Sequence, residues 1–291
     1  MKNVLFATTA LVLTAGVASA EVTFSGTGQV SLSSTAGADY VANTHLDLNV
    51  AISGATDNGM TFSTSVGYDA GQQADYNDDY VLDGAESGWA TGAPEVAIGY
   101  NGVTLTVQQN GVDNLFDDAS AQDLGVAGSM SGVDYAFTTD LSGGDSSYKL
   151  GYTVGDLSAT VTGTNDSTVG GTASKIAVSY AVAGATLSAS VQNESGEAED
   201  DQTVGVSYNM GAASVSYTAI KPGKNGSFGD EWDAKISYTA GAVSGYITMD
   251  EADTTHLVAE YDLGGATAFV SSTSATGTAN DFTAVGINFA F

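Results

Sequence analysis

Residues 203–211 read TVGVSYNMG, and this stretch decides the fold class of the chain. Val204, Val206 and Tyr208 alternate with glycine or a small polar residue, and a turn sequence with glycine follows the tyrosine. Alternation with a period of two is typical of a β-strand that has one apolar and one polar face. The stretch therefore predicts a strand that ends in a tight turn just after an aromatic residue.

The same alternation recurs along the chain, so we predict an all-β protein. Alternation alone does not separate a soluble sandwich from a membrane barrel, because both bury one face of each strand. The lengths of the connections have to decide between them. The alternating stretches are 45–53, 175–182, 203–210, 232–239 and 256–263.

The connections between these strands come in two lengths. Short turns at one end and longer loops at the other are typical of an up-and-down antiparallel barrel that spans the outer membrane. Eight short turns predict about eighteen strands, and loss of the least regular turn, at 131–132, would leave sixteen. Either number encloses an aqueous channel. The short turns are expected at 57–59, 101–102, 131–132, 152–155, 180–184, 208–211, 238–241 and 261–264, and the longer connections at 71–93, 165–172, 195–201 and 221–230.

Tyrosines and the carboxyl terminus support a barrel. Tyr152, Tyr180, Tyr208 and Tyr238 follow one another at intervals of roughly 28 to 30 residues, about one hairpin apart. They are expected to form an aromatic girdle at one membrane interface. The chain ends on an alternating strand, Ile287 to Phe291, which we expect to close the barrel by pairing with a first strand at 22–34.

Residues 1–20 have the layout of a secretory signal peptide. Lys2 supplies the positive charge, residues 4–17 are apolar, and Ala18-Ser19-Ala20 fits the small-residue cleavage pattern. The apolar stretch is too short for a helix that spans a membrane. We therefore expect residues 1–20 to be removed, which leaves residues 21–291 as a single barrel domain.

Composition excludes several classes of function. The formal net charge is −28 and the chain has no arginine, so it repels phosphates and nucleic acid is not expected as a partner. Cysteine is absent, which excludes a small disulfide-stapled scaffold and a cysteine nucleophile. The only histidines are His45 and His256, and no Gly-x-Ser-x-Gly motif occurs. An enzyme is not expected.

Short motifs resemble the general porins of alphaproteobacteria, the Rhodobacter type. They are the opening Glu21 to Gly26, the turn Thr56 to Met60, the Tyr-x-x-Gly-Ala turns and the terminal Ile287 to Phe291. The resemblance implies a homotrimer of outer-membrane barrels for small hydrophilic solutes, each narrowed by a third surface loop folded inside. In this chain that loop matches 110–121, and its three aspartates would form the acidic side of the pore constriction: Asp113, Asp117 and Asp118.

The chain departs from the porin pattern in the charge of the lumen wall. The resemblance implies arginines opposite the acidic loop, but this chain has none, and the loop is short. Inward lysines are expected to supply only a weaker positive charge, so the lumen is predicted to be net negative and cation-selective. The residues predicted to line the lumen wall are His45, Asp47, Asn49, Lys149, Lys175, Lys235 and His256.

Two acidic clusters suggest structural Ca²⁺ on surface loops, beside anionic lipopolysaccharide. Clustered carboxylates suit this ion, although neither cluster has the spacing of an EF-hand, and solvated surface charge is the alternative. The first cluster, the proposed metal site, is Asp75, Asp78, Asp79, Asp83 and Glu86, and the second spans 194–201.

Two alternatives to a general diffusion porin stay open. One is a substrate-selective porin, for example for a sugar, which eighteen strands and an aromatic track along the lumen would favour. Inward-facing Tyr246 is the one residue that points to such a track. The other is a secreted, acidic, β-rich surface protein.

Overall fold

The structure is a computed structural model that describes residues 18–90, 92–117, 119–166, 171–195, 199–223, 227, 229–276 and 281–291. Its described part is built from strands and connections, without helices. No described helix is long and apolar enough to cross a membrane. The signal peptide at 1–20 lies mostly outside the described residues, and its removal stays a prediction.

The strands begin and end as follows: β1 Ala18–Thr35, β2 Val41–Thr56, β3 Thr61–Gly71, β4 Ala74–Asp75, β5 Val81–Leu82, β6 Glu86–Trp89, β7 Val96–Tyr100, β8 Val103–Asp113, β9 Ser120–Met130, β10 Val133–Thr139, β11 Ser146–Val154, β12 Leu157–Asp166, β13 Gly171–Val182, β14 Ala185–Glu194, β15 Asp201–Met210, β16 Ala213–Lys221, β17 Glu231–Ala240, β18 Val243–Asp250, β19 Thr255–Asp262, β20 Ala266–Ser274 and β21 Phe282–Ala290.

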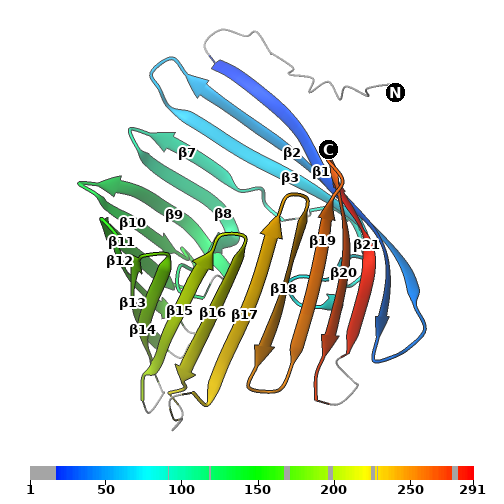
Figure 1. The fold of residues 1–291 in the computed structure, drawn as a ribbon. Helices are drawn as coiled ribbons and strands as arrows, with labels where there is room; N and C mark the ends of the chain where they lie inside the picture. The colour runs from blue at the N-terminus through cyan, green and yellow to red at the C-terminus, as the bar shows by residue number, and fades with distance from the viewer. Residues whose placement is uncertain are drawn as a thin grey trace.

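All of these strands except β4 and β5 form one closed antiparallel barrel, which has eighteen strands (Figure 1). Each strand pairs with its neighbours in chain order, and β1 pairs with both β2 and β21, which closes the sheet. The short segments β6 and β7 both pair with β3 and together make one barrel strand. The predicted fold class is confirmed at the larger of the two expected strand numbers.

The two ends of the barrel differ as expected. Eight tight turns join consecutive strands at the end where β1 begins and β21 ends, and the girdle tyrosines lie just before these turns. Tyr152, Tyr208 and Tyr238 each pair with the first residue of a neighbouring strand and are exposed on the outer face. They therefore lie at one level, where an aromatic side chain suits a membrane interface.

The barrel is closed where the last strand meets the first. Phe289 lies opposite Gly28, and the backbone of Phe291 exchanges two hydrogen bonds with Gly26, at 2.9 and 3.0 Å. A Cβ atom on Gly28 would lie 2.3 Å from the ring of Phe289, so glycine makes room for the aromatic ring. The expected pairing of the terminal strand with the first strand is confirmed.

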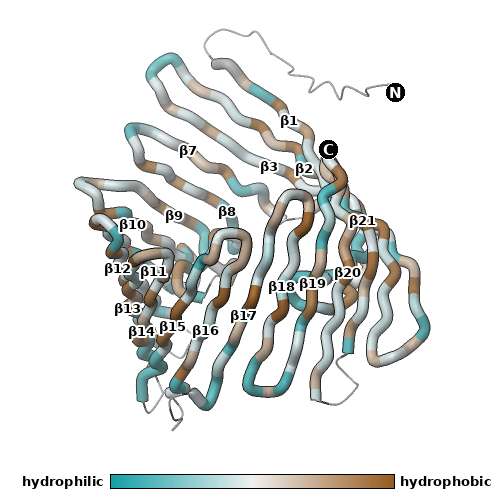
Figure 2. Tube along the Cα trace, viewed as in Figure 1, coloured by the Kyte–Doolittle hydropathy of each residue, from teal (hydrophilic) through white to brown (hydrophobic). Residues whose placement is uncertain are grey.

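The barrel has an apolar outer face and a polar inner face. On β13, Ile176 and Val178 are exposed on the outside, whereas Lys175 alternates with them on the inside. Figure 2 shows this alternation as brown and pale or teal bands along the strands. An apolar outside and a polar inside suit a strand that separates lipid from a water-filled interior.

One loop differs from its expected position at the surface. The connection between β3 and β7 starts with residues 72–83, which turn into the barrel and pack against its inner wall; we call them the inserted segment. The turn requires Gly71, whose φ of +96° suits glycine and whose Cβ position would lie 1.9 Å from the carbonyl oxygen of Thr44. Within the inserted segment, β4 and β5 form a small hairpin of their own.

Candidate functional site

The interior of the barrel, its lumen, is shaped by aromatic rings that hold the inserted segment against the wall. Tyr76 stacks on Phe269 of β20, and Tyr80 stacks on His256 of β19, each with ring centroids 3.7 Å apart. Tyr76 and Phe269 are 4% and 3% exposed. Burial of aromatic surface on this scale is the main force that docks the segment.

Polar contacts fix the position of the same rings. The Tyr76 hydroxyl donates to Glu260 Oε1 at 2.6 Å and accepts from Asn288 Nδ2 at 3.1 Å. The Tyr80 and Tyr246 hydroxyls lie 3.0 Å apart. Burial and the Glu260 carboxylate raise the pKa of Tyr76 above its usual range, so its hydroxyl stays protonated and able to donate.

Gln29 of β1 clamps the start of the inserted segment. Its Oε1 accepts from the Ala74 backbone N–H at 2.7 Å, and its Nε2 donates to the Ala74 carbonyl at 3.1 Å. Gln29 and Ala74 are 3% and 0% exposed, so water does not easily replace either bond. The side chain thus completes the hydrogen bonding of a peptide that has left the barrel sheet.

Gln29→Ala is expected to loosen the inserted segment. The change leaves two buried backbone groups of Ala74 without partners, at a cost of about 1–3 kcal/mol each. Chymotrypsin should then cut the folded barrel in detergent after Tyr76 or Tyr80 faster than it cuts the parent. Gln108→Ala, which removes an exposed bond to the Ala93 carbonyl, is the matched control and should leave the cleavage rate unchanged. Equal rates for both variants would contradict the clamp.

An acidic chamber lies beside the inserted segment. A cavity of about 270 Å³ is lined by carboxylates of β2, β3, β6 and the inserted segment, together with His45. The pKa of Asp83 is raised, first by burial and then by neighbouring carboxylates. The acidic residues of this chamber are Asp47, Asp69, Asp83 and Glu86.

The five residues of the predicted Ca²⁺ site lie in different surroundings. Asp83 and Glu86 face the acidic chamber. Asp75 Oδ1 accepts backbone hydrogen bonds from Asn77 and Asp78, so it shapes a turn. Asp78 and Asp79 are exposed in the inserted segment. The structure therefore does not gather the five residues around one point, and Ca²⁺ binding by them stays a prediction.

Half of the expected constriction loop at 110–121 belongs to strands. β8 runs to Asp113 and β9 starts at Ser120, so the loop proper is six residues long, and its short length follows from the strand pairing Asp113 to Ser120. It leans onto the inner wall, where Asn114 Nδ2 donates to Thr164 and the Leu115 N–H donates to Ser147. Asp113 and Asp117 are exposed, and Asp118 lies outside the described residues. Their role in a constriction stays a prediction.

The remaining predicted wall residues also lie on the inner face. Asn49 follows His45 and Asp47 along β2, and Lys149 and Lys175 stand on β11 and β13. Lys235 Nζ lies 3.9 Å above the ring of Tyr246. His256 Nδ1 lies 2.9 Å from the Thr273 hydroxyl, under the ring of Tyr80. The inner face also carries Asp134 and Asp233, and neither is paired directly with a lysine across the strands.

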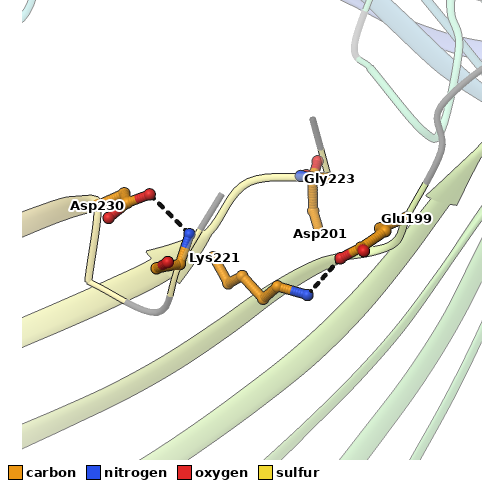
Figure 3. Close-up of polar contacts among 6 residues, drawn as sticks. Glu199, Asp201, Lys221, Gly223 and Asp230 are labelled. Carbon is orange, nitrogen blue, oxygen red and sulfur yellow. Dashed lines mark hydrogen bonds and ion pairs between the residues drawn. The ribbon is translucent and has the colours of Figure 1, made fainter. Parts of the chain in front are cut away.

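The second acidic cluster is used in contacts between loops (Figure 3). Lys221 Nζ pairs with Glu199 Oε2 at 2.7 Å, the one ion pair among the described residues. Asp201 accepts from the Gly223 backbone N–H, and Asp230, which lies outside the cluster, accepts from the Ser227 backbone N–H within its own connection. These carboxylates therefore order the loops around the mouth of the barrel.

Sequence reasoning missed Gln29, Asp69 and the pair Tyr76 and Tyr80. The two tyrosines carried a usable signal, because aromatic residues in an otherwise acidic and polar connection need a surface to pack on. Gln29 carried none, since it reads as one more polar residue of an alternating strand. Asp69 likewise occupies an ordinary inward position of β3.

Comparisons with known proteins agree with this architecture. A family model described as Gram-negative porin matches residues 7–291. A mutant of the Rh. blastica porin aligns with a TM-score of 0.57 and 20% identity, covering 93% of this chain and 100% of that chain. A mutant of OccD1 (OprD) aligns with a TM-score of 0.62 and 10% identity, covering 93% and 95%. Identities this low show a shared fold alone. No curated protein matches the sequence.

Proposed function

The chain belongs to the Gram-negative porin family, and from this we propose that it forms a water-filled, cation-selective channel for passive diffusion of small hydrophilic solutes and ions. The protein is located in the outer membrane, which removes a secreted surface protein from the alternatives. The family and the fold indicate a channel rather than an enzyme.

The observation that carries the proposal is the polar inner face of a closed barrel of eighteen strands. A barrel of this size is too wide for its own side chains to fill. The inserted segment occupies the part of the lumen along β18–β21, and the short β8–β9 loop leans on β11 and β12. Solutes would pass between these two obstructions.

Charge supports the preference for cations. The net charge is −28, there is no arginine, and the acidic chamber faces the lumen. A cleft lined by one sign of charge concentrates the opposite ion. The lysines at 149, 175 and 235 lie on other strands, so the positive charge is spread out while the carboxylates are clustered.

Liposome swelling tests the channel. Proteoliposomes in isotonic sugars of increasing size should swell at rates that fall smoothly with the size of the solute, and the folded barrel should migrate faster than the boiled one in detergent gels. Absence of swelling in vesicles that contain the folded barrel would overturn the proposal.

A second candidate is a substrate-selective channel. Eighteen strands and a group of aromatic residues inside the lumen favour it: Tyr246 and Phe269 on the wall, and Tyr76 and Tyr80 on the inserted segment. Most of this aromatic surface is used to dock the inserted segment, so general diffusion is preferred. Swelling that saturates with one sugar would favour the selective channel.

Assembly and export complete the proposal. We infer a homotrimer, because the exposed apolar outer wall can be covered by a second copy as well as by lipid. The signal peptide at 1–20 would direct export, and the acidic loops at the mouth would meet lipopolysaccharide through bridging Ca²⁺.

A further inference from the structure

Three side chains on neighbouring strands of the barrel wall converge in the acidic chamber. His45 of β2, Asp69 of β3 and Glu86 of β6 each offer one ligand atom, and these atoms all lie within 4.8 Å of one another. Backbone pairing fixes their bases, since His45 pairs with Gly71 and Gly71 pairs with Glu86. The cluster is thus part of the rigid wall.

Gly71 joins the strands that carry the three side chains. Its backbone pairs with His45 on one side and with Glu86 on the other. The contact of its Cβ position with the Thr44 carbonyl also prevents replacement by alanine without a shift of the backbone. Asp69 lies two residues back along β3 and closes the third side.

None of the three groups is occupied by another described residue. The only ion pair in the described part of the chain is Lys221 with Glu199, far along the sequence, and no described hydrogen bond engages the side chains of His45, Asp69 or Glu86. The histidine ring is not in salt-bridge distance of the two carboxylates beside it.

We propose that His45, Asp69 and Glu86 form a binding site in the channel wall for one divalent transition-metal ion, with Zn²⁺ as the best fit. One imidazole nitrogen and two carboxylate oxygens suit Zn²⁺, whereas Ca²⁺ and Mg²⁺ take oxygen ligands. Around Zn²⁺ with ligands at about 2.0–2.2 Å the ligand atoms lie about 3.3–3.6 Å apart, so small side-chain rotations complete the site.

The fourth position of the metal opens into the chamber. Its cavity of about 270 Å³ has room for water, and Asp83 and Asp47 also line it. A bound ion would neutralise part of the negative charge that faces the lumen. The proposed metal site does not depend on the proposed channel function. Only the effect of the bound ion on ion flow rests on that function.

Titration of the folded, metal-free barrel in detergent with Zn²⁺, in an excess of Ca²⁺, tests the site. The parent should bind one ion per chain. His45→Gln, Asp69→Asn and Glu86→Gln should each weaken binding by at least about tenfold, since even an outer partner of a metal ligand is worth about 10- to 100-fold in affinity. Glu95→Gln removes the same charge from an exposed position outside the cluster and should bind like the parent.

Two results would overturn the site. One is Zn²⁺ binding that His45→Gln leaves unchanged, and the other is Zn²⁺ binding that excess Ca²⁺ abolishes. Conductance of the same samples in planar bilayers keeps the two proposals apart. A barrel that conducts but does not bind Zn²⁺ refutes the metal site alone, and one that binds Zn²⁺ but does not conduct refutes the channel alone.

Discussion

Tyr76→Ala combined with Tyr80→Ala is expected to release the inserted segment and to raise the single-channel conductance. The two rings dock the segment on Phe269 and His256. Loss of a buried aromatic ring costs about 3 kcal/mol or more. Since 1.4 kcal/mol is a factor of ten, loss of the buried Tyr76 ring shifts the docked population by about two powers of ten, and loss of the half-buried Tyr80 ring adds to this shift. The larger sugars should also pass more quickly in liposome swelling.

The matched control removes two tyrosines from the outer face. Tyr100→Ala with Tyr261→Ala takes away the same side chains at the membrane interface, where they do not touch the lumen. This control should conduct like the parent. A variant with residues 73–83 replaced by a short glycine linker gives the upper limit of the conductance. If the variant with Tyr76→Ala and Tyr80→Ala conducts like the parent while the linker variant conducts more than the parent, the two rings do not hold the segment.

Asp47→Asn, Asp69→Asn and Glu86→Gln together are expected to remove most of the preference for cations. The three carboxylates face one chamber of the lumen, and the field of such a cluster amounts to a few kT. The ratio of cation to anion permeability should therefore fall by roughly three- to tenfold, as measured by the reversal potential in a salt gradient. High salt should reduce the difference between variant and parent, because it screens these charges.

A control variant with the same change in net charge tests whether the effect comes from the acidic chamber itself. Asp57→Asn, Asp156→Asn and Asp253→Asn change the net charge by the same amount at exposed positions in turns. The permeability ratio of this control should match that of the parent. An equal fall in both variants would mean that the total charge, and not the acidic chamber, sets the selectivity.

The strands and turns could be predicted from the sequence because each is a local pattern. Val204, Val206 and Tyr208 alternate within one strand, and the turn that follows them is a local choice of residues. The girdle tyrosines and the terminal Phe291 follow from the same patterns once the strands are placed. Closure between β1 and β21 was predictable because a terminal strand with apolar alternation needs a partner.

The path of the loops could not be predicted, because it depends on contacts between distant residues. Tyr76 meets Glu260 and Asn288 across the barrel, at sequence separations of 184 and 212 residues. The tyrosines of the inserted segment indicate that it needs a surface to pack on, but nothing local says which surface that is. The cluster of His45, Asp69 and Glu86 is likewise visible only once the register of three strands is known.

A salt gradient across a planar bilayer that contains the parent barrel tests the channel and its selectivity together. If the lumen is water-filled and its wall carries the acidic chamber, the current should rise in discrete steps. The reversal potential should then have the sign expected when cations permeate more readily than anions. Conductance steps with a reversal potential of the sign expected for preferred anions would contradict the proposed cation selectivity. A folded barrel that inserts into the bilayer without any conductance steps would contradict the proposed channel function.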